Sequence, residues 1–182
     1  MKILILGVGN ILCADEGVGV IFVKWFESIY KIHHANTNYS LDFIDGGTLC
    51  MQLTPIISKY DKMILCDCID SNTQNVADVF FFDYKDIPNN INFQGSAHEV
   101  ETFAMLNFMD ILNDLPKTHI LAIKPNRIEQ MSLEISSDLA HGIQTMENTL
   151  KSELEKLGFV LTKTNNTDIF TFAKKYASFS NK

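Results

Sequence analysis

The chain has 182 residues, of which 46% are hydrophobic, and its 22 acidic and 15 basic side chains give a formal net charge of −7. This size and apolar content suit one globular domain that buries its own core without disulfides or a structural metal. The acidic balance argues against general binding to nucleic acid or to an anionic membrane. No apolar run approaches the ~18 residues of a membrane span, and the first residues lack a signal-peptide pattern, so we expect a cytoplasmic protein without membrane insertion.

The chain opens with a predicted strand, a glycine turn and a helix. Residues 2–6 (KILIL) are a short apolar run typical of a buried parallel strand. Gly7 and Gly9 allow a sharp turn, and Asp15 is placed to cap the helix that follows. That helix has one apolar stripe at intervals of three and four residues, made by Val18, Ile21, Phe22, Trp25, Phe26 and Ile29. Asp15 and Glu16 are therefore expected where this helix begins.

The glycine turn at residues 7–9 begins like a dinucleotide-binding fingerprint, but two features argue against that function. The third glycine of the fingerprint falls on Leu12. A bound pyrophosphate would also face the carboxylates of Asp15 and Glu16. Two interpretations of these acids stay open. They cap the helix, where its dipole favours them, or they bind a cation together with residues from elsewhere in the chain.

Strands and helices alternate along the rest of the chain. Further strands are predicted at residues 40–45, 62–68, 78–84 and 118–123, with 78–84 near an edge because no helix precedes it. Further helices are predicted at residues 49–60, from His98 to residue 111, and from Ser137 to residue 157, where Gly158 closes the last one. Pro55 interrupts the first of these, so either that helix kinks or its regular part begins with Thr54 as cap and Pro55 at the first position. Residues 85–97 indicate a loop, and the segment after 158 is expected to hold one short strand or a loose tail. The alternation predicts a single three-layer α/β/α domain with a mainly parallel twisted sheet.

Three polar residues are expected at the edge of this sheet where such folds bind ligands, beyond the carboxyl ends of the strands. Glu16 follows the first strand, Asp67 lies at the end of the third, and His98 opens the helix after the long loop. Two carboxylates and one imidazole make an open site for a divalent ion, without a thiolate to hold a soft metal tightly. The alternative is a structural role: Asp67 could cap the loop after its strand, and His98 could cap or begin the helix that follows the long loop.

Motifs of the common hydrolases are missing from the sequence. A zincin needs a second histidine four residues after His98, and that position holds Thr102. No G-x-S-x-G elbow is present, which argues against a serine hydrolase of the α/β type. The cysteines form neither a C-x-x-C pair nor a secreted framework and are expected to pack as free thiols; they are Cys13, Cys50, Cys66 and Cys68.

Four segments together resemble the hydrogenase maturation proteases, the endopeptidases that trim the C-terminus of the large subunit of [NiFe] hydrogenases. They follow the order of the family at similar separations and are residues 7–20 (GVGNILCADEGVGV), 45–48 (DGGT), 64–68 (ILCDC) and 96–98 (SAH). The resemblance covers residues 1–160 as one α/β domain. It leaves residues 161–182 as a C-terminal extension of unknown role.

This resemblance implies that Glu16, Asp67 and His98 contact nickel that belongs to the substrate, so that no tightly bound metal of the protein's own is expected. The implied substrate is a hydrogenase large-subunit precursor, which loses a short C-terminal extension after nickel insertion. Asp45 is a candidate catalytic residue that orients water or the scissile segment, and the alternative is a turn-stabilising role. A non-enzymatic nickel-site chaperone or partner of the large subunit is the second functional hypothesis, and a nucleotide-binding α/β protein is the third.

Overall fold

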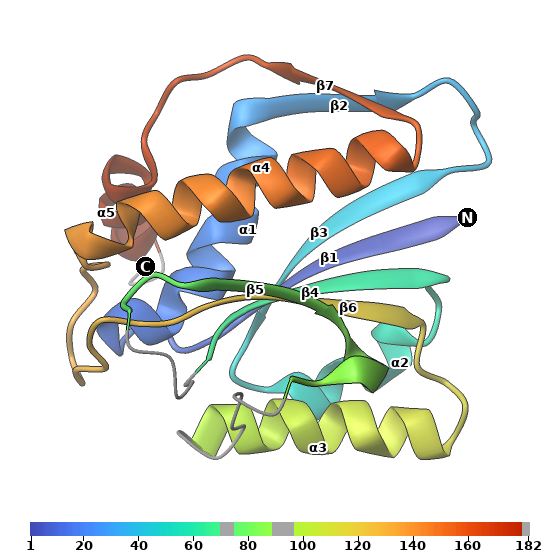
Figure 1. Ribbon diagram of the computed structural model, residues 1–182, viewed down its shortest axis with the longest axis horizontal. Coiled ribbons are helices and arrows are strands. Elements are labelled where there is room, and N and C mark those ends of the chain that lie inside the picture. The colour runs from blue at the N-terminus through green and yellow to red at the C-terminus, as the bar shows by residue number, and fades with distance from the viewer. Residues whose placement is uncertain (70–74, 89–96, 180–182) are drawn as a thin grey trace.

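The structure is a computed structural model that describes residues 1–69, 75–88 and 97–179, without the side chains of 97–99 and 177–179. A five-stranded sheet in the order β3-β1-β4-β6-β5 lies between two helical layers (Figure 1). Its strands are β1 (Lys2–Val8), β3 (Ser40–Gly47), β4 (Lys62–Cys68), β5 (Val79–Asp83) and β6 (Lys117–Ile123). Neighbouring strands are parallel except for β5, which runs antiparallel to β6 at the edge. The predicted α/β fold with a mainly parallel sheet is therefore confirmed.

Both faces of the sheet are buried, which explains the nearly continuous apolar runs in β1 and β4. Ile3 and Ile5 face the layer of α1 (Val18–Ile29) and α4 (Ala140–Lys156). Leu4 and Leu6 face the layer of α2 (Thr54–Ile57) and α3 (Ala97–Ile111). Successive residues of a strand point to opposite faces, so one apolar segment supplies both cores. None of the helices in the described part of the chain is long and apolar enough to cross a membrane.

Short 3-10 segments join several of these elements. They are η1 (Ala14–Gly17), η2 (Cys50–Leu53), η3 (Tyr84–Asp86) and η4 (Ser137–Leu139). Of the two alternatives at residues 49–60, the structure is closer to the second: η2 comes first, and the four-residue α2 begins at Thr54 with Pro55 in its first turn, although its N-cap is Leu53. Proline is tolerated only at the start of a helix, where its missing N–H has no intrahelical partner. Gly158 adopts a φ of +89° after α4, as expected of a residue that ends a helix.

Two features lie outside the predicted pattern. A second sheet pairs β2 (Tyr30–His34) antiparallel with β7 (Phe159–Lys163), and β2 was not predicted. The short strand expected after residue 158 is present as β7. The segment after it forms a further helix, α5 (Ile169–Phe179), which contacts α1 (Figure 1). The expectation of a loose tail is wrong for this part, because buried Ile169 and Ala173 join the core on the α1 side of the sheet.

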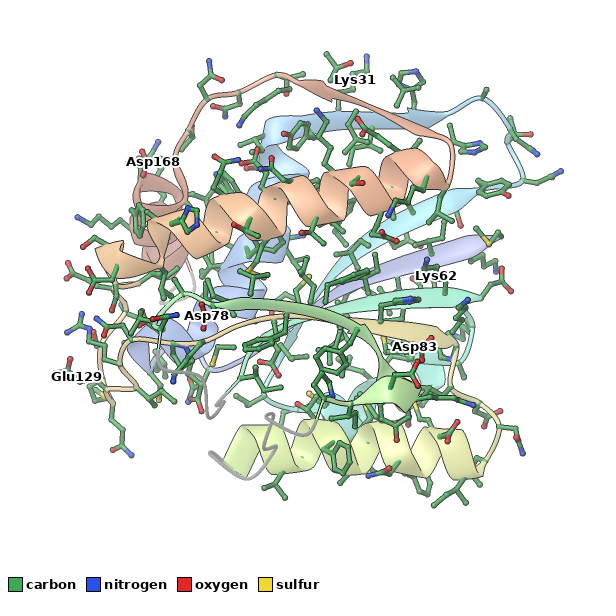
Figure 2. All side chains as sticks on the ribbon, in the orientation of Figure 1. Lys31, Lys62, Asp78, Asp83, Glu129 and Asp168 are labelled. Atoms are coloured by element: carbon green, nitrogen blue, oxygen red, sulfur yellow. The ribbon has the colours of Figure 1, made fainter. Side chains whose placement is uncertain are left out.

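The register of the parallel strands aligns their carboxyl ends at one edge. Gly7 of β1 pairs with Asp45 of β3 on one side and with Cys66 of β4 on the other. Asp45 and Asp67 therefore lie at nearly the same level of the sheet. They are two strands apart, so the usual spacing between neighbouring strands puts their backbones about 10 Å from each other. In Figure 1 the first turn of α3 lies at this end of the molecule, and Asp78 and Glu129 are labelled at the same end in Figure 2. This edge is the candidate functional site.

Candidate functional site

Close packing of α1 on the sheet sets the position of Asp67. Gly19, in the first turn of α1, lies against the ends of two strands. A Cβ at Gly19 would be 2.4 Å from the carbonyl oxygen of Val8, 2.3 Å from that of Cys66 and 2.9 Å from Cα of Asp67. Only glycine permits this approach of a helix to strand ends. The side chain of Asp67 is almost fully buried, with 1% of the residue exposed.

The glycine turn sets the position of Glu16 in a similar way. Gly9 has a φ of +135°, and a Cβ there would lie 2.0 Å from the carbonyl oxygen of Glu16. Glu16 belongs to η1, which packs against β4, the strand that carries Asp67. Glu16 is 6% exposed. The structure thus places two buried carboxylates on adjoining segments at the carboxyl edge of the sheet, as the sequence predicted.

Asp15 has another role than the predicted one. Neither η1 nor α1 has a side-chain cap, so the prediction that Asp15 caps the helix is wrong. Its buried carboxylate instead accepts three backbone N–H groups from the segment after β6. These are Asn126 and Arg127, each at 3.0 Å from Oδ2, and Ser136 at 2.6 Å from Oδ1. Asp15 therefore holds this segment against the glycine turn.

The third predicted ligand, His98, lies in the first turn of α3, and its side chain is outside the described part of the structure. One turn later on the same helix, fully buried Thr102 contacts Cys50 of η2, with 3.3 Å between Oγ1 and Sγ. Burial raises the pKa of the Cys50 thiol to about 11, and the carboxylates of Asp67 and Glu101 add to this effect. Cys50 thus connects the second turn of α3 to η2.

Asp45 occupies the exposed turn at the end of β3. Its Oδ1 accepts the N–H of Gly47 at 2.9 Å, and its Oδ2 accepts the hydroxyl of Tyr176 at 2.7 Å. Gly47 in turn accepts the N–H of Gly9 at its carbonyl oxygen, at 2.9 Å, which ties this turn to the glycine turn. The turn-stabilising interaction considered for Asp45 is present. Tyr176, from the C-terminal helix, was not identified as a site residue.

The cysteines are poor candidates for a nucleophile. Burial raises the pKa of the Cys66 thiol, as does the neighbouring carboxylate of Asp67. The pKa of Cys13 is raised by burial and by the carboxylate of Glu16. Attack requires the thiolate form, which these environments disfavour at neutral pH. The described side chains, which do not include that of His98, hold no group of three or more His, Cys, Asp or Glu that could bind a metal ion.

A family model for the hydrogenase maturation proteases, HycI, matches residues 23–153. The chain belongs to the hydrogenase maturation protease family. Protein HydD of Wolinella succinogenes is 36% identical to it over 132 residues, which cover 72% of this chain and 83% of that protein. The hydrogenase 2 maturation protease of Escherichia coli is 28% identical over 130 residues, covering 71% of this chain and 76% of that protein.

Solved structures of hydrogenase maturation proteases share this fold. The maturating endopeptidase HybD of E. coli superposes with a TM-score of 0.76 at 24% identity, covering 90% of this chain and 98% of that one. The [NiFe] hydrogenase maturation protease HybD of Thermococcus kodakarensis gives a TM-score of 0.63 at 22% identity, covering 87% and 99%. Membership of this family identifies the protein as a peptidase and favours the enzymatic hypothesis over a chaperone. The buried acids at the start of α1 stand where a nucleotide's phosphates would bind, which argues against the third hypothesis.

Proposed function

We propose that this hydrogenase maturation protease removes a C-terminal extension from the large-subunit precursor of a [NiFe] hydrogenase, after nickel has entered the precursor. Glu16, Asp67 and His98 would contact the nickel carried by the substrate. The observation that supports this best is the pair of buried carboxylates, Glu16 and Asp67, on segments packed together at the carboxyl edge of the sheet. A divalent cation bound between the two carboxylates would offset the negative charge that these acids bring into a buried place.

The donor types fit the proposed cargo. Carboxylate oxygens with one imidazole suit a borderline divalent ion such as Ni²⁺ but do not hold it as firmly as a thiolate site would. A site that binds the metal ion weakly suits a protein that contacts a metal belonging to its substrate. In the complex the nickel would serve as a Lewis acid, which lowers the pKa of bound water. Asp45, exposed at the end of β3, is the proposed residue that orients this water or the scissile peptide.

The test uses nickel-loaded and nickel-free forms of the same precursor and follows the mass of the large subunit. We expect cleavage of the loaded form only, however much protease is added. Treating the protease alone with a chelator, and then removing the chelator, should leave its activity unchanged. An enzyme that stays inactive until zinc or nickel is restored to it, or that cuts the nickel-free precursor equally well, would contradict the proposal.

A matched pair of variants tests the proposed nickel contact. Glu16→Gln removes a charge with little change of shape and should lower cleavage by at least about 100-fold while the fold is retained. Glu155→Gln is the control, because exposed Glu155, near the C-terminal end of α4 and away from this edge, pairs with Lys151 on the surface and such pairs contribute little. Equal cleavage by both variants would remove Glu16 from the site.

A further inference from the structure

The C-terminal helix α5 places one side chain at the candidate site. The hydroxyl of Tyr176 donates a hydrogen bond of 2.7 Å to Oδ2 of Asp45, across 131 positions of the sequence. The other carboxylate oxygen of Asp45 accepts the N–H of Gly47. Both oxygens of this exposed carboxylate therefore have a fixed partner, and each oxygen keeps a lone pair for a further donor.

This contact continues into the segment that carries Glu16. The carbonyl oxygen of Gly47 accepts the N–H of Gly9 at 2.9 Å. Gly9 in turn packs against the backbone of Glu16, where a Cβ would come within 2.0 Å of the carbonyl oxygen. A continuous series of contacts thus leads from Tyr176 through Asp45 and both turns to Glu16.

Other contacts anchor α5 independently of the Tyr176 hydroxyl. Ile169 and Ala173 are buried in the core on the α1 side, and partly buried Phe172 packs against the same core. Before the helix begins, the indole N–H of Trp25 in α1 donates to the carbonyl oxygen of Thr167 at 2.7 Å. The helix would therefore stay docked without the hydroxyl, which makes a role for the hydroxyl separable from the folding of α5.

We propose that Tyr176 is a positioning residue for the reaction, which holds the Asp45 carboxylate in the orientation that cleavage requires. This inference rests on the proposed function and gives the C-terminal extension a part in the site. Burial and the hydrogen bond to Asp45 raise the pKa of the Tyr176 phenol, so the group keeps its proton and donates throughout the neutral range. A carboxylate held by two donors loses rotational freedom before the substrate binds, which lowers the cost of reaching the reactive geometry.

The chain offers a closely matched control. Tyr60 donates its hydroxyl to Oδ2 of Asp42 at 3.0 Å, and Asp42 lies three residues before Asp45 on the same strand, toward the opposite edge of the sheet. Tyr176→Phe and Tyr60→Phe each remove one hydroxyl from one Tyr–Asp pair of β3 and keep the ring. The full-length protein carries each variant, and thermal unfolding verifies that both are folded.

The first measurement is the kinetics of cleavage of nickel-loaded precursor. Tyr176→Phe should lower kcat by about three- to tenfold, the size expected from one hydrogen bond, while KM stays within about twofold. Tyr60→Phe should change neither constant by more than about twofold. A Tyr176→Phe variant with unchanged kcat would overturn the proposal, as would an equal loss in both variants.

The second measurement does not depend on nickel or on the precursor. Amide hydrogen exchange at Gly47 reports the hydrogen bond to Oδ1 of Asp45, and Tyr176→Phe should speed it about three- to tenfold, unlike Tyr60→Phe. Unchanged exchange at Gly47 would show that Tyr176 does not fix Asp45 and would overturn the proposal. Failure of the wild-type protein to cleave nickel-loaded precursor would instead overturn the proposed function, and the exchange at Gly47 would then decide alone whether Tyr176 positions Asp45.

Discussion

Asp15 and Glu16 are neighbours in the sequence, but only one of them faces the candidate site as a proposed ligand. The carboxylate of Asp15 accepts three backbone N–H groups, from residues 126, 127 and 136. A carboxylate that accepts several N–H bonds serves the loop that donates them and has little capacity left for a ligand. At this scale Asp15 is structural, and Glu16 is the acid proposed to recognise the substrate's nickel.

We expect Asp15→Ala to lower the free energy of unfolding by about 3 kcal/mol, because three donors in a buried or partly buried place lose their acceptor. Urea denaturation measures this change. Asp138→Ala is the control, since exposed Asp138 accepts a side-chain hydrogen bond from Asn126 at 2.7 Å and its loss should cost less than about 1 kcal/mol. Equal costs for the two variants would contradict the structural role of Asp15.

At the scale of elements, the approach of α1 to β1 and β4 decides the geometry of the site. The helix begins directly after η1, which carries Glu16, and Gly19 in its first turn lies against the residue that forms the other buried carboxylate. A displacement of α1 from the strand ends would therefore separate Glu16 from Asp67. The absence of a side chain at Gly19 is a requirement of the site as well as of the fold.

Gly19→Ala should lower the free energy of unfolding by about 2–3 kcal/mol, because its Cβ would overlap two backbone carbonyl oxygens that have no freedom to move away. The rate of cleavage should also fall at a temperature where the variant is fully folded. Loss of folded protein does not explain such a decrease. Gly142→Ala in α4 serves as the control. Its Cβ would lie 2.4 Å from the carbonyl oxygen of Ala77, so we expect a similar cost in stability with cleavage largely retained. Comparable losses of cleavage in both variants would argue against a specific role for the α1 contact.

At the scale of the whole molecule, the two ends of the sheet differ in their chemistry. The carboxyl edge holds the candidate site, while Lys62 and Asp83 are labelled at the opposite end in Figure 2. His119 of β6 pairs in register with Asp83 and stacks on Phe81 at 5.3 Å. Its Nδ1 is buried and has no hydrogen-bond partner within the described ranges. A histidine in this setting is stable in its neutral form.

The stability of the protein should therefore decrease in mild acid. Burial, with the positive charge of Lys62 nearby, lowers the pKa of His119 from its ordinary value of 6.5. Below about pH 6.5 the unfolded chain binds this proton more readily than the folded one, so the free energy of unfolding falls as the pH falls. His119→Gln should flatten this dependence between about pH 7 and pH 5 in denaturation curves. Exposed His141 gives the control variant His141→Gln, and identical slopes for the two variants would reject the role of His119.

Local sequence patterns were sufficient to predict the central sheet and the edge at which Glu16 and Asp67 lie. A strand that is covered on both faces has apolar side chains at consecutive positions. Apolar runs such as residues 2–6 and 62–68 therefore indicate buried strands. Parallel strands end at one edge, so residues that follow different strands can be placed together without a structure. For this reason the sequence alone predicts Glu16 and Asp67 at the same edge.

The C-terminal helix α5 has a helical spacing of apolar residues in the sequence, although no helix is predicted there. Ile169, Phe172, Ala173 and Tyr176 follow the spacing of one helical face, and this face packs on the core. The strand β2 gives a weaker signal, since it alternates between half-buried and exposed residues and pairs with a strand from the far end of the chain. Its partner β7 cannot be identified from the spacing of residues within either segment.

The sequence by itself determined the strands of the central sheet, the faces that they bury and the edge where Glu16 and Asp67 lie, because periodicity and turn chemistry act between near neighbours. Only the tertiary structure decided the partners of the acids. Asp15 bonds to backbone groups more than 100 positions away, and Asp45 bonds to Tyr176 across 131 positions. Each such bond depends on how two packed elements bring their ends together, and residues so far apart in the chain carry no local pattern that specifies the contact.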